Sequence, residues 1–393
     1  MKEYKLSQLL EIKNGKDHKE LPNGDYPVFG SGGVMRYVNE YLYDKASILL
    51  PRKGSLNNIQ YCDVPFWTVD TLYYTEVNEK IACPYYLYNY LCLLDLSGLD
   101  TGTGVPSMTF DSYYNIKVLL PEIEEQKRVA SVLQNLDHKI ALNRQINDNL
   151  EAMAKQLYDY WFVQFDFPNE EGKPYKSSGG TMVYNEKLKR EIPQGWHCYE
   201  LNKWLEIKSG FAFKSETYIS KGKFKVVTIK NVQDHHLDTS SCDYVYEIPQ
   251  GMKEWCSLSV NDRLISLTGN CGRLCIVTEN DLLLNQRVGL LACNDEYIDY
   301  AYLLLSSEEY QTLSNNLAKG AAQANLSPVD LCKNIAVLPK LDVLEKFNRQ
   351  IKPIVASYIQ NEIQIAELTK QRDELLPLLM NGQASVNYHL SAY

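Results

Sequence analysis

The sequence predicts an α+β protein in which two mixed α/β domains are joined by two long helices. The helices are expected to form an antiparallel coiled coil, and the chain to be duplicated with pseudo-two-fold symmetry. Two segments, YKLSQLLEIKNG from Tyr4 and YELNKWLEIKSG from Tyr199, share one pattern. Each globular stretch ends in Leu-Pro, at Pro121 and at Pro339, and a segment with helical periodicity follows. Because only two long copies occur, the repeat indicates a duplicated domain and excludes a solenoid.

These signals divide the chain into six parts. They are a first domain (residues 1–121), a first long helix (122–167), a connecting segment (168–186), a second domain (187–339), a second long helix (340–383) and a C-terminal tail (384–393). The connecting segment contains PNEEGKPYKSSGG, whose composition predicts a flexible, polar connection. The second domain is longer than the first, which indicates an insertion in the second copy.

Within the domains, short β-rich runs separated by glycine turns predict small irregular sheets. Strands are expected at residues 47–50, 66–74, 224–229, 263–267 and 281–291, and helices at residues 84–94 and 297–307. This mixture places both domains in the mixed α/β class.

The two long helical segments have apolar residues at alternating spacings of three and four, which is typical of a coiled coil. The matched positions are Val129, Leu133, Leu136, Ile140, Leu150 and Leu157 in the first copy, and Phe347, Ile351, Ile354, Tyr358, Leu368 and Leu375 in the second. Pro353 indicates either a kink or the true start of the regular helix. The matched patterns favour pairing of the two helices within one chain.

Asn143 and Asn361 occupy equivalent positions in this apolar pattern and are the candidate register residues of the helix pair. In an antiparallel pair, equivalent central residues meet at the symmetry axis. Two facing amides satisfy each other's hydrogen bonds, whereas a single amide facing apolar side chains loses them. We therefore expect the two side chains to touch, with Ile140 and Tyr358 packed on either side.

Composition excludes several classes of protein. No apolar run approaches the roughly 18 residues of a membrane span, and the N-terminal segment lacks the apolar core of a signal peptide, so a cytoplasmic protein is expected. The ten cysteines form no CxxC pair, which favours buried thiols over a metal site. A net charge of −9 means that DNA binding would need local basic patches or basic partners.

Motifs of the common catalytic classes are missing from the sequence. It contains no Walker loop, GxSxG or HExxH pattern, and no Asn/Asp-Pro-Pro-aromatic box for methyl transfer. The EIK segments that begin at Glu11 and Glu206 resemble the end of a nuclease site. No upstream acidic partner accompanies them, so we interpret them as solvated faces.

Basic and amide side chains recur in loops of both copies and are the candidate DNA contacts. Such side chains bind phosphates or read base edges in the major groove. The candidates are Arg52, Lys53, Ser55, Asn57 and Asn58 in the first domain, and Lys221, Lys223, Lys225, Lys230, Asn231, Asn285, Gln286, Arg287, Gln323 and Asn325 in the second. Any one of them could belong to an ordinary surface loop, but their recurrence at matched places favours function.

Four segments together resemble the specificity subunits of type I restriction–modification systems. Residues 119–130 (LLPEIEEQKRVA) are similar to the opening of that family's first conserved region, and residues 157–168 (LYDYWFVQFDFP) to its end. Residues 192–196 (IPQGW) resemble the entry to the second recognition domain, and residues 375–382 (LLPLLMNG) the end of the C-terminal helix. The second conserved region departs from the first, because Leu344-Glu345 stands where the first has Glu125-Gln126-Lys127.

The resemblance implies a non-catalytic subunit whose two target recognition domains each read one half of a split sequence in double-stranded DNA. The helices would set the spacing and bind two modification (methyltransferase) subunits, and restriction (translocase/nuclease) subunits would add cleavage. It implies no cofactor on this chain, with S-adenosylmethionine, ATP and Mg on the partner subunits. The residues also leave open a coiled-coil adaptor with two protein-binding domains, whereas the missing motifs disfavour a fused restriction enzyme.

Overall fold

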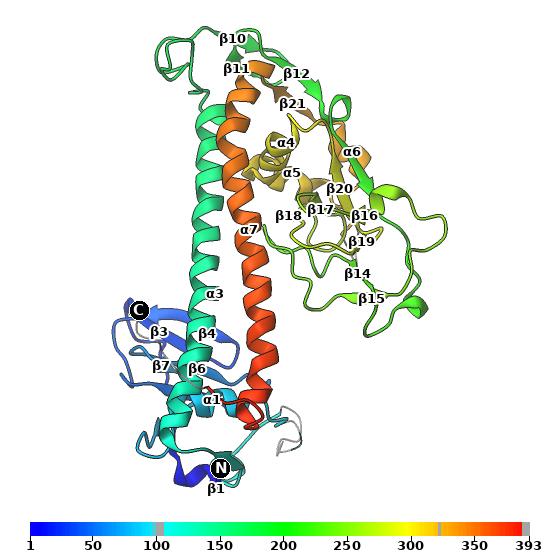
Figure 1. The fold of residues 1–393 in the computed structure, drawn as a ribbon. Coiled ribbons are helices and arrows are strands. Elements are labelled where there is room, and N and C mark those ends of the chain that lie inside the picture. Colours follow the sequence, from blue (N-terminus) through cyan, green and yellow to red (C-terminus); the bar gives the residue numbers. More distant parts are fainter. Residues whose placement is uncertain (97, 99–105, 321–323, 387–393) are drawn as a thin grey trace, which may run out of the picture. The chain divides into compact units, whose positions relative to one another are not determined.

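The computed structural model describes residues 1–96, 98, 106–320 and 324–386 (Figure 1). The chain forms two compact units, the first made of Met1–Ala141 and Glu367–Tyr393 and the second of Leu142–Ala366. Each unit contains one mixed α/β domain together with part of each long helix. The division therefore falls within the long helices and not at the ends of the domains.

In its described residues, the domain of the first unit is built from three small sheets and two short α-helices. The sheets have the strand orders β2-β8-β5-β6, β4-β3-β7 and β1-β9. The elements are β1 Lys2–Lys5, β2 Leu10–Lys13, β3 Asn23–Gly30, β4 Gly33–Val38, β5 Ser47–Pro51, β6 Gln60–Cys62, β7 Trp67–Thr68, β8 Leu72–Val77, α1 Pro84–Cys92, α2 Phe110–Tyr114 and β9 Lys117–Leu120. The buried rings of Tyr86 and Tyr113 bring both helices into one core with the four-stranded sheet.

The domain of the second unit repeats this plan. Its sheets have the orders β13-β20-β17-β18, β15-β14-β19-β16 and β12-β21. The strands are β12 His197–Glu200, β13 Glu206–Ser209, β14 Phe224–Val227, β15 Asp243–Val245, β16 Ser257–Leu258, β17 Arg263–Ser266, β18 Leu274–Ile276, β19 Leu282–Leu284, β20 Val288–Ala292 and β21 Ile335–Leu338. The helices are α4 Ile298–Ser306, α5 Glu308–Leu317 and α6 Pro328–Cys332.

Strand pairing confirms the duplication in detail. In the four-stranded sheet of each unit, the strand that comes first in the chain pairs antiparallel with the strand that comes last. These pairs are β2 with β8 and β13 with β20. Among the described strands, β3 pairs parallel with β7 in the first unit, and β14 pairs parallel with β19 in the second. The extra length of the second copy lies in strand β16 and in the loop between β14 and β15, which spans residues 228–242, whereas the turn between β3 and β4 contains only Ser31 and Gly32.

Two expected strands are each divided into a pair of shorter ones. Residues 66–74 contain all of β7 and the start of β8, and residues 281–291 contain β19 and most of β20. In each case a three-residue turn carries the chain from one sheet to the next, closed by hydrogen bonds from Leu72 N to Val69 O (3.0 Å) and from Val288 N to Asn285 O (2.9 Å). The expectation was wrong about continuity because a change of sheet leaves no mark on the apolar pattern.

The two long helices are α3 (Ile123–Tyr158), with 36 residues, and α7 (Leu341–Met380), with 40 residues. At about 1.5 Å per residue they extend roughly 54 and 60 Å. A π-helical turn, Asp159–Val163, follows α3 and buries Trp161 and Phe162. Helix α7 runs through Pro353 without ending, so that proline does not mark its start. Gly382, with φ of 69°, follows the end of α7 and suits the left-handed conformation found there.

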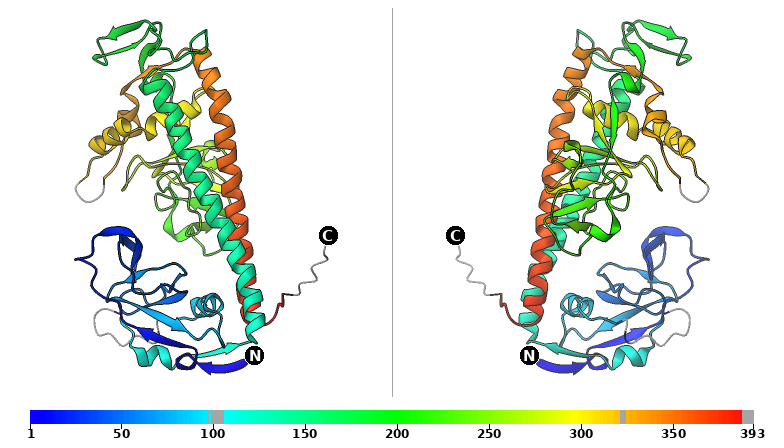
Figure 2. Two further views of the ribbon diagram at one scale, coloured as in Figure 1. Left: turned by 90° about the vertical axis from the view of Figure 1, so that its left-hand side faces the viewer. Right: turned by 90° about the vertical axis from the view of Figure 1, so that its right-hand side faces the viewer.

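Within the second unit, α3 and α7 pack antiparallel, as the views in Figure 2 show. Asn361 donates a hydrogen bond to Asn147 (3.0 Å), Asn143 donates to Gln364 (3.2 Å), and the rings of Trp161 and Phe347 lie 5.7 Å apart. The expected antiparallel packing is confirmed, but the amides expected to face each other, Asn143 and Asn361, each bond a partner about one helical turn away. The buried amide is Asn147, which is 4% exposed and also donates to Glu362 (2.6 Å), so this side chain sets the register.

Within the first unit, the N-terminal part of α3 and the C-terminal part of α7 share the domain core. Leu133 and Val129 of α3 join the same buried cluster as Leu379 and Met380 of α7. Arg372 donates to Asp137 across the pair at 2.9 Å. Apolar packing thus holds the two helices together in both units. In the first unit, the Arg372–Asp137 ion pair also links α7 to α3.

The connecting segment after α3 is folded back on itself, whereas its composition predicts a flexible link. Tyr175 stacks on Phe167 with ring centroids 4.7 Å apart, and Ser177 donates to Asp166 at 2.6 Å. Strands β10 (Met182–Asn185) and β11 (Arg190–Pro193) then form a hairpin. These aromatic and hydrogen-bond contacts join residues far enough apart that local composition does not reveal them.

Candidate nucleic-acid interface

The candidate interface in each domain is built on a backbone crossing beside the four-stranded sheet. In the first unit, Arg52 N donates to Thr71 O (2.9 Å), Met108 N to Arg52 O (3.0 Å) and Gly54 N to Pro106 O (2.9 Å). We call this arrangement of residues 52–54, 69–71 and 106–108 the first crossing platform. It joins the end of β5, the turn between β7 and β8, and the segment before α2.

The second unit contains the same crossing. Leu267 N donates to Arg287 O (2.9 Å), Leu326 N to Leu267 O (2.8 Å) and Gly269 N to Ala324 O (2.9 Å). Residues 267–269, 285–287 and 324–326 form this second crossing platform. Three matched hydrogen bonds align the two platforms residue by residue, so Lys53 corresponds to Thr268 and Thr71 to Arg287.

A glycine occupies the same corner of both platforms. Gly54 has φ of 96° and Gly269 has φ of 74°, a left-handed conformation that residues with a Cβ rarely adopt. A Cβ added to Gly54 would lie 3.6 Å from Ser31 Oγ, and one added to Gly269 would lie 3.5 Å from Ile229 Cδ1. Each platform therefore lies beside the loop that joins β3 to β4 or β14 to β15.

Of the first-domain candidates, Arg52 and Lys53 lie on the platform. Arg52 donates to Asp70 O (3.3 Å) and stands over the ring of Tyr73, while Lys53 is exposed. Ser55 follows in the next loop and is also exposed. Asn57 accepts from Leu96 N (3.1 Å) and Asn58 donates to Ser31 O (2.5 Å). These two amides therefore fix local loops, which reduces their capacity to read bases.

The second platform gathers four of the candidates from the second domain. Gln286 and Arg287 are exposed at the turn between β19 and β20. Asn285 is 8% exposed and holds that turn by accepting from Arg287 N (3.1 Å). Asn325 accepts from the Thr268 hydroxyl (2.9 Å). Gln323 lies outside the described residues.

The expected basic strand of the second domain is β14, and its charge is partly neutralised. Lys225 of β14 donates to both carboxylate oxygens of Glu279, at 3.0 and 2.9 Å. Lys221 and Lys223 are exposed, and Lys223 stands over the ring of Phe224. An ion pair of this kind weakens the attraction of Lys225 for phosphate.

The remaining two candidates, Lys230 and Asn231, lie in the turn after β14 and differ in their exposure to solvent. Lys230 is exposed, whereas Asn231 is 1% exposed. The Asn231 carboxamide accepts from Thr228 N (2.8 Å) and donates to Asp238 O (2.9 Å), so it stabilises its own loop. The prediction that Asn231 is a DNA-contacting side chain is wrong because its hydrogen bonds are used within the fold.

Sequence reasoning missed several platform residues. Asp70 and Thr71 occupy the turn equivalent to Gln286 and Arg287, and Ser107 lies opposite Lys53 in an isolated bridge. Neither the Asp70-Thr71 pair nor Ser107 belongs to a recognisable sequence motif. The one signal in the sequence is the Lys53-Gly54 turn, which the Thr268-Gly269 pair repeats.

The loop of residues 228–242 reaches α7 within the second unit. The Tyr358 hydroxyl donates to His235 O at 2.7 Å, and His236 Nδ1 lies 3.2 Å from a carboxylate oxygen of Glu362. That carboxylate, through a hydrogen bond, raises the pKa of His236 above its ordinary value. Burial, together with Asp148 and Glu362, raises the pKa of nearby Glu151 to about 7. The insertion thus attaches the second domain to the helix pair.

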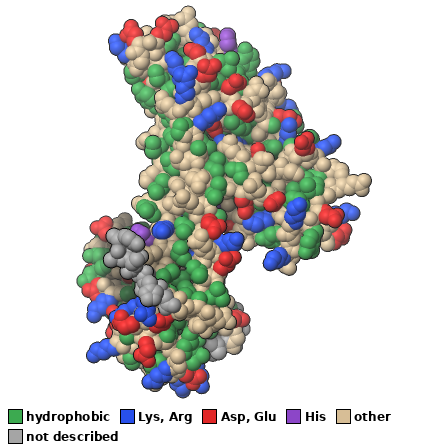
Figure 3. Space-filling model, in the orientation of Figure 1, with side chains coloured by type: hydrophobic (Ala, Val, Ile, Leu, Met, Phe, Trp, Pro, Cys, Tyr) green, Lys and Arg blue, Asp and Glu red, His purple; other side chains and the backbone are tan. Residues whose placement is uncertain are grey.

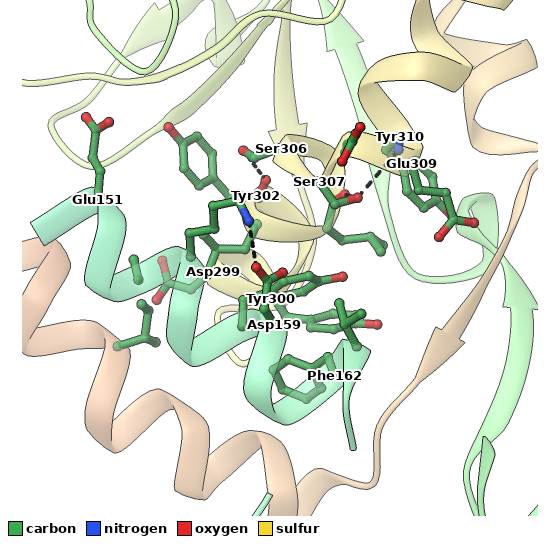
Figure 4. Close-up of a pocket in the computed structure, with 18 of the residues that line it drawn as sticks. Glu151, Asp159, Phe162, Asp299, Tyr300, Tyr302, Ser306, Ser307, Glu309 and Tyr310 are labelled. Atoms are coloured by element: carbon green, nitrogen blue, oxygen red, sulfur yellow. Dashed lines mark hydrogen bonds and ion pairs between the residues drawn. The ribbon is translucent and has the colours of Figure 1, made fainter. Parts of the chain in front are cut away.

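A cavity of about 670 Å³ lies between α3, α4, α5 and α7 in the second unit. Figure 4 shows acidic side chains on several sides of it, including Glu151, Asp159 and Glu309. Lys155 and Arg190 also line the cavity, and Lys155 pairs with Asp159 at 2.6 Å, so the lining has mixed charge and offers no continuous basic surface to a nucleic-acid backbone. The space-filling view in Figure 3 likewise shows acidic and basic side chains interspersed, with no extended basic face on the side in view.

Comparison with known proteins assigns the family. The chain matches the family model described as type I restriction modification DNA specificity domain over residues 1–152 and 193–372. It is 26% identical to the type I restriction enzyme MjaIX specificity subunit of Methanocaldococcus jannaschii, covering 94% of this chain and 86% of that protein. It is 29% identical to the MjaVIII specificity subunit of the same organism, covering 86% and 76%.

The fold agrees with this family. The crystal structure of a type I restriction–modification system S subunit from M. genitalium has a TM-score of 0.62 and 18% identity, covering 96% of this chain and 95% of that chain. The chain belongs to the type I restriction–modification specificity subunits, which are the non-catalytic components of their complexes. This membership favours the recognition-subunit interpretation over the coiled-coil adaptor.

Two further observations concern the described part of the chain. None of its helices is both long and apolar enough to cross a membrane. The same residues contain no group of three or more His, Cys, Asp or Glu side chains arranged to hold a metal ion.

Proposed function

We propose that this chain reads a bipartite sequence in double-stranded DNA and directs adenine methylation and restriction by partner subunits. The repeated crossing platform carries the proposal. The two platforms share backbone hydrogen bonds but differ in side chains, with Arg52 and Lys53 on one and Gln286 and Arg287 on the other. One scaffold bearing two sets of donors suits a protein that reads two different half-sites.

The charge of the chain supports a role for partners. A net charge of −9, with basic and acidic side chains interspersed, gives little sequence-independent attraction to DNA. Two modification subunits, one for each copy of the duplicated frame, would supply the missing phosphate contacts. They would also carry S-adenosylmethionine and the methylation chemistry. Restriction subunits would bring ATP, Mg and cleavage. All of these components would act in the cytoplasm, where bacterial and archaeal DNA is found.

Binding measurements with and without modification subunits test the proposal. The isolated chain should bind DNA weakly, and the assembly with two modification subunits should bind one bipartite duplex tightly and selectively. Affinity should fall steeply as salt is raised, because the partners contribute phosphate contacts. Tight, site-specific binding by the isolated chain would contradict the role given to the partners. An assembly that binds all duplexes equally would contradict the proposed reading function.

A further inference from the structure

The two crossing platforms carry their exposed cation at different positions. In the first, Lys53 continues β5 and is exposed, while Thr71 in the neighbouring turn is half-buried. In the second, the residue equivalent to Lys53 is Thr268, which is 5% exposed and donates to Asn325. The residue equivalent to Thr71 is Arg287, which is exposed. The backbone hydrogen bonds are therefore shared by the two platforms, while the exposed cation lies in the segment after β5 in the first and in the hydrogen-bonded turn beside the equivalent segment in the second.

We propose that the position of this cation on the platform determines which base pair of each half-site is read as guanine. Lys53 would do so in the first domain and Arg287 in the second. The inference rests on the proposed function and adds to it a residue in each domain. Lys and Arg donate to the O6 and N7 atoms of guanine in the major groove, and Arg can do so with two hydrogen bonds.

The spacing of the strands gives the expected size of the effect. Neighbouring strands lie about 4.8 Å apart, whereas successive base pairs rise by about 3.4 Å. The two platform segments are hydrogen-bonded to each other as neighbouring strands are, so moving a cation from one segment to the other should move the reading position by one or two base pairs. It should leave the opposite half-site unaffected, because the change is confined to one domain.

Asp70 indicates that the first platform faces base edges and not the phosphate backbone. It lies in the same turn as Thr71, is exposed, and corresponds to Gln286 of the second platform. A carboxylate beside phosphates would be repelled, whereas in the major groove it can accept a hydrogen bond from the amino group of cytosine. The two platforms would thus differ in acceptors as well as in donors.

A charge-neutral relocation of the cation tests the inference. The double variant Lys53→Thr with Thr71→Arg moves the exposed cation of the first platform to the position that Arg287 occupies in the second, without changing net charge. The probes are duplexes in which each base pair of the first half-site is replaced in turn, methylated by the assembly with its modification subunits. We expect at least about tenfold loss of discrimination at one guanine and a new guanine preference one or two base pairs away. The second half-site and the salt dependence should stay as in the original chain.

Single substitutions keep the test decisive if the double variant does not fold, which its thermal unfolding would show. Lys53→Gln should lose discrimination at one base pair, and Lys45→Gln, an equal charge change at an exposed residue away from the platform, should not. A folded double variant with unchanged preference at every base pair would overturn the inference. So would a uniform loss of affinity in Lys53→Gln, because that pattern marks a phosphate contact. If the unaltered assembly shows no bipartite preference, the proposed function itself fails.

Discussion

The two domains share a strand order but are fastened to the long helices in different ways. In the first unit, Gln126 in the first turn of α3 accepts from Cys83 N (2.9 Å) and donates to Ile81 O (3.0 Å). In the second unit, Asn348 in the second turn of α7 donates to Glu296 O (2.8 Å). Both side chains hold the loop that precedes the domain's helix, α1 or α4.

This difference explains why the sequence at the start of α7 departs from the sequence at the start of α3. The amide that clamps the domain has moved along the helix by about one turn, so Leu344-Glu345 can stand where the first copy has Glu125-Gln126-Lys127. The second domain gains a further attachment through its insertion, by the Tyr358–His235 hydrogen bond and the His236–Glu362 contact. Duplication has conserved the scaffold while the attachments diverged.

The cores of the domains also differ. In the first, Ser47 and Thr75 exchange neutral hydrogen bonds, with Ser47 Oγ donating to Thr75 O at 2.7 Å. In the second, Arg263 and Asp299 form a buried ion pair at 2.6 Å, with side chains 1% and 5% exposed. Losing one member of a buried ion pair is more costly than losing one neutral hydrogen bond, because the remaining charge stays buried.

The largest expected effect comes from exchanging a whole domain. Replacing residues 1–121 with the first domain of another family member should change one half of the methylated sequence completely and leave the other half as before. The physical reason is that each platform is built from residues of one domain. Mapping of methylated adenines measures the outcome. A change in both halves would show that the two domains do not read independently.

The next largest effect concerns the buried ion pair of the second domain. Asp299→Ala should lower the free energy of unfolding by about 3–5 kcal/mol, because Arg263 is left buried without its partner. Ser47→Ala in the first domain should cost less, about 1–3 kcal/mol. Asp295→Ala, at an exposed carboxylate near the start of α4, serves as the control and should change little. Equal effects of Asp299→Ala and Asp295→Ala on thermal unfolding would contradict the expectation that the buried ion pair stabilises the second domain.

The register of the helix pair predicts a smaller difference between two asparagines. Asn147→Ala should destabilise the protein by about 1–3 kcal/mol, because Asn361 and Glu362 lose a buried partner. Asn143→Ala, at a more exposed site, should cost no more than about 0.5 kcal/mol. Denaturant unfolding of both variants provides the measurement. A larger loss of stability in Asn143→Ala than in Asn147→Ala would contradict the assignment of Asn147 as the residue that sets the register.

The smallest predicted effect is a pH dependence confined to the second unit. Burial raises the pKa of Glu151 to about 7, so the folded state favours its protonated form and stability falls as pH rises from about 4.5 through 7. Because its pKa is raised above 6.5, His236 contributes stability that is present below pH 6.5 and lost as pH rises through the raised value. Burial lowers the pKa of His235, which opposes this trend below pH 6.5.

A single substitution isolates the Glu151 contribution. Glu151→Gln should stabilise the protein more at pH 8 than at pH 6, by on the order of 1 kcal/mol after screening by solvent. Melting temperatures of variant and original chain at both pH values give the difference. A stabilisation that is the same at both pH values would show that this carboxylate is not strained in the folded protein.

The sequence predicted the features that arise from repetition and periodicity. The duplicated domains, the long helices and elements such as α1 and α4 follow from patterns of adjacent residues. The crossing platforms could not be predicted in this way, because each requires hydrogen bonds among three separate segments, such as residues 52–54, 69–71 and 106–108. Asn231 shows the same limit at the level of one residue, since only the folded turn reveals that its amide is already satisfied.

The helix register shows how a nearly correct pattern misleads. Aligning the apolar positions of the two copies pointed to Asn143 and Asn361 as partners. The fold instead pairs Asn361 with Asn147, because Asn147 is the amide that is buried and therefore must be satisfied. Sequence periodicity identifies the face of a helix, whereas tertiary burial decides which residue on that face sets the register.

Mapping methylated adenines in cells that contain this chain and its modification subunit determines whether each domain reads one half of a split DNA sequence. We expect one motif made of two short specified segments separated by a fixed number of unspecified base pairs. The motif should disappear when this chain is removed while the modification subunit is kept. A single continuous motif would show that the two domains do not read separate half-sites, and a motif that persists without this chain would show that another protein reads the DNA.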